Sequence, residues 1–119
     1  MKLARCRVKS VAASPNENVR TTYGGLCHEF PVMVRTCGLC QAVAFSLDKA
    51  QSNDAHGLLL DDLSKVLGVD RNQLAGCIEA MNTTEYMLAT RKVLSAWLFF
   101  KRFAVSILKV KTGQDAQGG

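Results

Sequence analysis

A single apolar stretch, Tyr23 to Leu47, constrains the fold of this 119-residue chain more than any other segment. Apolar side chains in its first half recur at the spacing of one helical face, about 100° per residue. These side chains are Tyr23, Leu26, Cys27, Phe30 and Val34. A second face follows Gly38, where Leu39, Val43 and Leu47 repeat every four residues. Two such faces joined by a short turn bury each other, so we predict a helical hairpin as the centre of the fold.

A proline interrupts the first half of this stretch. Pro31 cannot donate a backbone hydrogen bond, and its ring clashes with the preceding helical turn. We therefore expect a helix from about Val19 to Arg35 that is either bent at Pro31 or broken there into two helices. Gly38 is expected to turn the chain into the next helix, which runs to about Gln51.

Helical spacing and capping residues continue through the rest of the chain. Residues 2–13 are expected to form a short helix, and Asn53 is placed to cap a further helix that ends before Gly68. Asp70 is expected to cap another short helix. Asn82 and Glu85 have the spacing of a capping box, which predicts that the last and longest helix begins here and runs to about Val110.

The chain contains no alternating strand pattern. We therefore predict an all-α fold, a single-domain bundle of five to six helices with a long C-terminal helix. The helical domain is expected to span residues 1–111. The small polar residues 112–119 are expected to form a disordered tail. No apolar run approaches the roughly 20 residues that a membrane span requires, and no apolar segment typical of a signal peptide follows the basic N-terminus. The sequence thus predicts a cytoplasmic protein.

Charge is distributed unevenly along the chain. Residues 1–35 carry a net charge of +4, residues 36–85 a net charge of −4, and residues 86–119 a net charge of +5. Arg91, Arg102 and Lys109 lie within about 20° of one another on a helical wheel, opposite the apolar face of the last helix. Such a basic face can bind nucleic-acid phosphates without reading sequence, or it can simply be solvated.

Two cysteines, Cys37 and Cys40, form the motif most suggestive of chemistry. Together with Cys27 and His28 they provide, by number alone, enough ligands for zinc. A CxxC pair can also take part in disulfide exchange. Structural zinc sites usually bring a second close pair, and a redox CxxC follows a strand, so we predict that these cysteines serve packing. Five cysteines without a secretion signal further indicate reduced thiols. No metal or cofactor is therefore predicted, and a small metal or redox protein remains the alternative.

Other polar and aromatic residues give weaker signals. Asp61 and Asp62 diverge by about 100° on a helix, so we expect both to be solvated rather than to bind a cation. Trp97 and Phe100 are expected in the core. Phe99 lies toward the polar side of its helix and is expected to be exposed to a partner.

Two segments resemble one known protein family. Residues 23–45 and 86–108 are similar to segments of the fifth subunit of the type III-B CRISPR Cmr module, a small α-helical subunit. In the first segment the matching residues are Tyr23, Gly24, Leu26, Pro31, Arg35, Gly38, Leu39, Gln41, Ala42, Ala44 and Phe45. In the second they are Tyr86, Arg91, Leu94, Trp97, Lys101, Arg102, Phe103 and Ala104. The family has small residues where this chain has Cys37 and Cys40, which also favours packing.

The resemblance implies a non-catalytic subunit that stacks along the backbone filament of an RNA-guided effector complex. Its partners would be the other Cmr subunits, copies of itself, and the guide and target RNA. Arg35, Arg91, Lys101 and Arg102 occupy matching positions and are the expected RNA contacts. Lys92 and Lys109 join them because of the basic stripe alone. A helical adaptor that binds only proteins is a further alternative.

Overall fold

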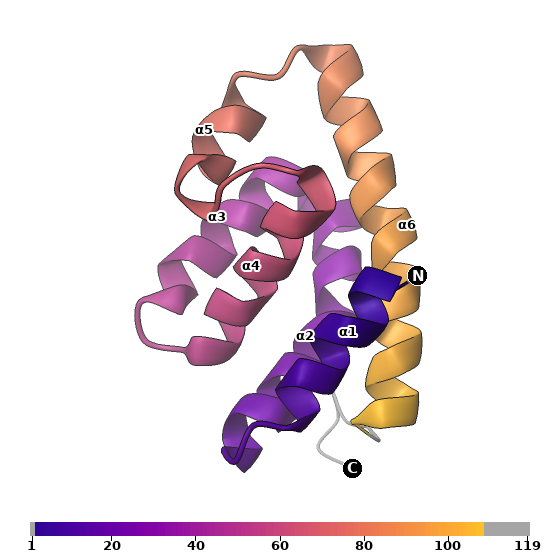
Figure 1. Ribbon diagram of the computed structural model, residues 1–119. Coiled ribbons are helices and arrows are strands. Elements are labelled where there is room, and N and C mark those ends of the chain that lie inside the picture. Colours follow the sequence, from indigo (N-terminus) through magenta and orange to yellow (C-terminus); the bar gives the residue numbers. More distant parts are fainter. Residues whose placement is uncertain (1, 109–119) are drawn as a thin grey trace.

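The predicted helical hairpin lies at the centre of the fold, formed by α2 (Glu17–Cys37) and α3 (Leu39–Ala50) (Figure 1). The computed structural model describes residues 2–108. Pro31 lies inside α2, which continues unbroken through it, so the helix is not divided there. Gly38 makes the turn, with φ of 90°, a conformation that favours glycine. A Cβ at this position would lie 3.1 Å from the hydroxyl of Tyr86, which accepts a hydrogen bond from the Cys40 N–H at 2.9 Å.

The longest helix is α6 (Thr83–Ile107), and its start confirms the predicted capping box. The Asn82 side chain accepts a hydrogen bond from the Glu85 N–H at 2.8 Å, and the Glu85 side chain accepts one from the Asn82 N–H at 2.9 Å. The buried face of α6 places Trp97 at the centre of the core. Its ring lies 5.1 Å from Phe30 and 4.5 Å from Phe100, which confirms the prediction that Trp97 and Phe100 are core residues.

Four further elements complete the described part of the chain. These are α1 (Lys2–Ala12), α4 (Asp54–Leu67), the short 3-10 helix η1 (Arg71–Gln73) and α5 (Leu74–Glu79). Asn53 caps α4 as predicted, and Gly68 ends it in the left-handed conformation. Asp70 makes no side-chain capping bond, contrary to our expectation, because the chain first forms η1.

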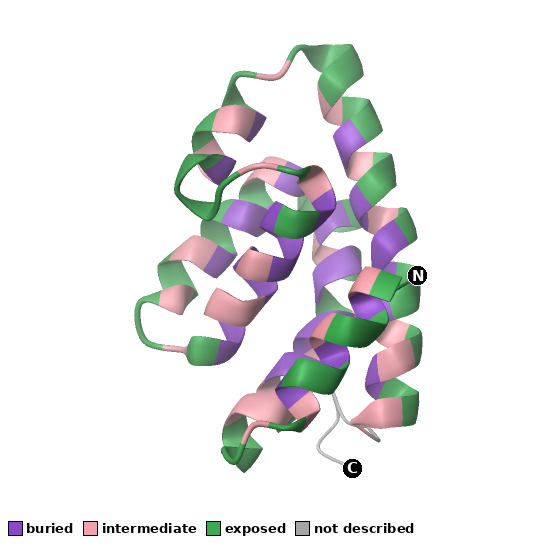
Figure 2. Ribbon diagram, viewed as in Figure 1, coloured by how far each residue is buried: buried purple, intermediate pink, exposed green. Residues whose placement is uncertain are grey.

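The helices pack so that α6 and α3 lie along opposite sides of the bundle (Figure 1). Helix α1 packs on α6, α2 contacts both α6 and α4, and α4 packs against α3. Figure 2 shows the buried faces of these helices turned inward, toward one shared core. The all-α prediction is confirmed. Within residues 2–108, no helix combines the length and the apolar content needed to cross a bilayer.

Candidate nucleic-acid and subunit interface

The predicted cations are concentrated on the solvent-facing side of α6. Arg91, Lys92 and Arg102 are exposed, and Lys101 is half-buried. No acidic residue follows Glu85 in α6, so nothing on this helix neutralises them. Arg35 is exposed in the last turn of α2 and therefore comes from a different helix. Lys109 lies outside the described residues.

The same side of α6 is unusually apolar. Five of the seven large hydrophobic side chains that are exposed in the described structure belong to it: Met87, Leu88, Leu98, Phe99 and Val105. Leu98 is 59% exposed, and at about 100° per residue it lies within about 40° of both Arg91 and Arg102 on the helix surface. The Arg102 guanidinium lies 5.9 Å from the centre of the Phe99 ring, which is exposed as predicted. This mixed row of cations and apolar side chains is called the α6 outer face below.

The other two exposed large hydrophobic side chains lie on the central hairpin. Val32 of α2 is 52% exposed and Phe45 of α3 is 43% exposed. Lys49 lies 5.5 Å from the centre of the Phe45 ring, and His56 meets that ring edge-on at 6.0 Å. Because exposed apolar side chains gather at contact sites, we call Val32 and Phe45 the hairpin patch.

His56 packs against the Phe45 ring in a T-shaped arrangement. It is buried, and its Nδ1 has no hydrogen-bond partner within the described structure. Burial lowers the pKa of His56 and the nearby Lys49 lowers it further, while Glu29 opposes the shift. The imidazole is therefore held neutral, and it serves the hairpin patch as a packing group.

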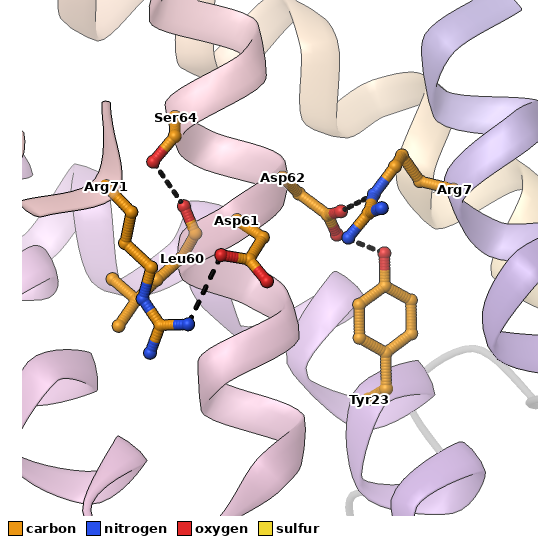
Figure 3. A network of polar contacts seen from close by, with 7 residues as sticks. All are labelled: Arg7, Tyr23, Leu60, Asp61, Asp62, Ser64 and Arg71. Carbon is orange, nitrogen blue, oxygen red and sulfur yellow. Dashed lines mark hydrogen bonds and ion pairs between the residues drawn. The ribbon is translucent and has the colours of Figure 1, made fainter. Parts of the chain in front are cut away.

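One polar network was not predicted from the sequence, and it corrects our expectation for Asp62. Asp62 is fully buried, whereas we expected it to be solvated. The Arg7 Nε donates to its Oδ1 at 2.5 Å, and the Tyr23 hydroxyl donates to its other oxygen (Figure 3). Asp61 instead pairs with Arg71 at 3.2 Å near the surface. The missed signal is that Asp62 stands three residues after Leu59 and four before Val66, on the buried face of α4.

The Asp62 network fastens three helices together. Arg7 belongs to α1, Tyr23 to α2 and Asp62 to α4. Burial raises the pKa of Asp62, and the hydrogen bonds from Tyr23 and Arg7 oppose that shift. Burial likewise raises the pKa of the Tyr23 hydroxyl, which stays protonated and donates. Asp62 thus accepts hydrogen bonds from both Arg7 and Tyr23, and the network holds α1 in place.

The cysteines divide into different environments. Cys27 is buried, and burial raises the pKa of its thiol, so it packs as predicted. Cys40 is half-buried, between α3 and α5. Cys37 is exposed, so the packing prediction is wrong for this residue: it falls on the outer side of the last turn of α2. In the part of the chain that the structure describes, no three histidine, cysteine or acidic residues are grouped to hold a metal ion.

Comparison with known proteins decides the family. The model of the CRISPR-associated protein family Cas_Cmr5 matches residues 1–107. The chain belongs to the Cas_Cmr5 family. A curated relative, the CRISPR system Cmr subunit Cmr5 of Thermus thermophilus, is 37% identical over 91 residues, which cover 76% of this chain and 78% of that protein. The resemblance found in two segments of the sequence therefore extends over nearly the whole chain.

A solved structure of this family has the same fold. The crystal structure of a CRISPR-associated Cmr5 family protein from Thermus thermophilus superposes with a TM-score of 0.76 at 34% sequence identity. The match covers 89% of this chain and 91% of that one. The arrangement of helices described above is therefore that of the Cas_Cmr5 family.

Proposed function

We propose that this protein is a non-catalytic subunit of a cytoplasmic CRISPR Cmr complex, where it stacks with copies of itself beside other subunits and lines the path of guide and target RNA. A relative over most of the chain is named as a Cmr subunit, which supports the assembly. The observation that carries the proposal is the α6 outer face, where cations alternate with exposed apolar side chains and no acidic residue follows Glu85 on the same helix. The buried titratable Asp62 is already engaged by Arg7 and Tyr23, which favours a structural role over chemistry.

The cations support contact with RNA. Positive side chains bind phosphates without reading bases, as is needed beside a guide RNA whose sequence varies. The proposed contacts are Arg35, Arg91, Lys92, Lys101 and Arg102, with Lys109 as a further candidate beyond the described residues. Arg91 and Arg102 lie in the middle of the α6 outer face, and Lys92 and Lys101 lie on its two flanks at about 100° per residue.

Reversing charge on α6 tests the RNA contact. The triple variant R91E/K101E/R102E should bind labelled single-stranded RNA at least about tenfold more weakly than the wild type, because phosphate neutralisation provides the affinity. Fluorescence anisotropy over a range of salt concentrations measures both the affinity and its salt dependence. The matched control K49E/K65E/R71E makes the same change of net charge in the acidic middle of the chain and should retain more affinity. Equal binding by the wild type and the α6 variant would rule out this contact.

The apolar side chains support stacking. The α6 outer face and the hairpin patch hold all seven exposed large hydrophobic side chains of the described structure. Phe45 lies on α3, on the side of the bundle opposite α6, whereas Val32 lies on α2, which packs against α6 (Figure 1). Two exposed acids, Glu29 and Asp48, and one exposed cation, Lys49, accompany the hairpin patch on α2 and α3, whereas the α6 outer face carries Arg91 and Arg102. The apolar side chains of the α6 outer face of one copy can therefore pack on the hairpin patch of the next, where Glu29 and Asp48 are available to pair with Arg91 and Arg102.

Mixing two variants tests this arrangement. L98Q disrupts the α6 outer face and F45Q disrupts the hairpin patch, so each protein alone should sediment as a monomer under conditions where the wild type associates. A mixture of the two should form dimers and nothing longer, because one intact face of each kind remains to pair. Sedimentation velocity measures the distribution. A wild type that stays monomeric at every concentration, or single variants that associate as it does, would contradict the stacking.

A further inference from the structure

Helix α1 presents a separate row of cations that sequence reasoning did not single out. Lys2, Arg5 and Lys9 are all exposed, and at about 100° per residue they fall within about 60° of one another. The opposite face of α1 buries Ala4, Val8 and Val11 against the bundle. Lys2, Arg5 and Lys9 are called the α1 stripe below.

The cations of the α1 stripe destabilise the helix to which they belong. Cations spaced three and four residues apart repel one another, and Lys2 opposes the helix dipole in the first turn. No acidic residue occurs in α1, and none of the three cations pairs with a carboxylate in residues 2–108. An isolated helix of 11 residues is also too short to be stable in water. The helix therefore depends on its contacts with the bundle.

Those contacts fix the direction of the α1 stripe. Burial of Ala4, Val8 and Val11 and the ion pair from Arg7 to Asp62 set the rotation of α1 about its axis. Arg7 is engaged in this pair, so of the four cations in α1 one anchors the helix and three face the solvent. The α1 stripe is thus held in a fixed orientation relative to the bundle.

The surroundings of the stripe favour a nucleic-acid partner over a protein partner. The exposed side of α1 contains no large apolar side chain, whereas protein interfaces bury an apolar centre, as the α6 outer face offers. α1 also lacks aromatic residues that could stack on bases. A row of cations with neither feature is suited to a phosphodiester backbone.

We propose that α1 is a second phosphate-binding element, in which Lys2, Arg5 and Lys9 contact the backbone of single-stranded RNA while Arg7 and Asp62 position the helix. This inference rests on the proposed function, because it assumes that the protein binds RNA. It adds a contact surface on a second helix, α1, which packs on α6, and this surface is insensitive to base sequence.

The test compares three variants that each remove three positive charges. K2Q/R5Q/K9Q removes the three cations of the α1 stripe, R91Q/K101Q/R102Q removes three cations of α6, and the matched control K49Q/K65Q/R71Q removes the three cations of the acidic middle. Each full-length protein is titrated into a labelled oligouridine at several salt concentrations, with anisotropy as the readout. Thermal unfolding should show K2Q/R5Q/K9Q to be as stable as the wild type or more so, because the substitutions relieve repulsion.

We expect K2Q/R5Q/K9Q to lower the affinity for oligouridine at low salt by about tenfold or more. The slope of log K against log salt concentration should become shallower by about 2, because each phosphate contact to a single strand contributes about 0.7 to that slope. The control should lose much less affinity. If K2Q/R5Q/K9Q behaves like the control while the α6 variant loses binding, the inference fails and the proposed function stands. If the wild type itself does not bind RNA, both fail.

A competition experiment separates RNA from an acidic protein partner. Poly-glutamate offers carboxylates without phosphates, and it should displace oligouridine from the wild type only poorly. Competition by poly-glutamate as strong as that of unlabelled oligouridine, and lost in K2Q/R5Q/K9Q, would overturn the inference in favour of an acidic protein surface.

Discussion

Asp62→Ala is expected to destabilise the protein by about 3 kcal/mol, because removing one partner of a buried ion pair leaves the other uncompensated. The Arg7 side chain is only 19% exposed, and the Tyr23 hydroxyl is fully buried. Both groups would lose their acceptor in the alanine variant. The value lies at the low end of the range for buried pairs because Arg7 still reaches some water. Denaturant unfolding followed by circular dichroism measures the change.

Asp62→Asn is the matched control for this prediction. The amide oxygen can still accept a hydrogen bond from Tyr23, and the side-chain volume is kept, so the loss should be smaller than for alanine. The asparagine variant distinguishes the contribution of the negative charge to stability from that of the hydrogen-bond acceptor. Equal stability of the wild type and Asp62→Ala would show that the network does not hold α1, α2 and α4 together.

Trp97→Ala is expected to cost about 3–5 kcal/mol of unfolding free energy, as large aromatic deletions in a core do. The ring is fully buried and packs against Phe30 at 5.1 Å and Phe100 at 4.5 Å, so its removal leaves a cavity between α2 and α6. The same unfolding measurement applies. A loss below about 1 kcal/mol would mean that this position is not part of a packed core.

Trp97→Phe is the matched control for Trp97→Ala. The indole Nε1 of Trp97 is buried, and no hydrogen-bond acceptor meets it in the described structure. Phenylalanine keeps an aromatic ring beside Phe30 and Phe100 and removes that unsatisfied donor. We therefore expect Trp97→Phe to be much less destabilising than Trp97→Ala. A loss as large as that of alanine would show that the full indole volume is required.

The helical spacing of apolar residues predicted most of the fold, because each buried face is long and regular. The stretch from Tyr23 to Leu47 became α2 and α3, and the Asn82–Glu85 spacing marked the start of α6. Pro31 shows the limit of local reasoning. Its cost within a helix is local, but burial of that face of α2 is a tertiary gain that no single residue reveals. The predicted tail at residues 112–119 lies outside the described structure.

The candidate site was less predictable because it depends on which side chains are left uncovered. The cations on α6 were named from the sequence, and Arg91, Lys92 and Arg102 are exposed. The apolar part of the α6 outer face was not foreseen beyond Phe99, since Leu98 and Leu88 read as ordinary helix residues until the packing is known. Asp62 was misjudged because its partner Arg7 stands 55 positions away in the chain.

The two exposed apolar surfaces differ in composition, and this has a consequence for assembly size. In the stacking proposed above, an interface between unlike faces would not close on itself as a twofold dimer does, so each added molecule would leave a fresh docking face free. Growth would then continue until a different protein occupies the terminal face. The length of such an array would be set by its end-capping neighbours and by the span of the nucleic acid beside it, and the small subunit alone would have no fixed stoichiometry.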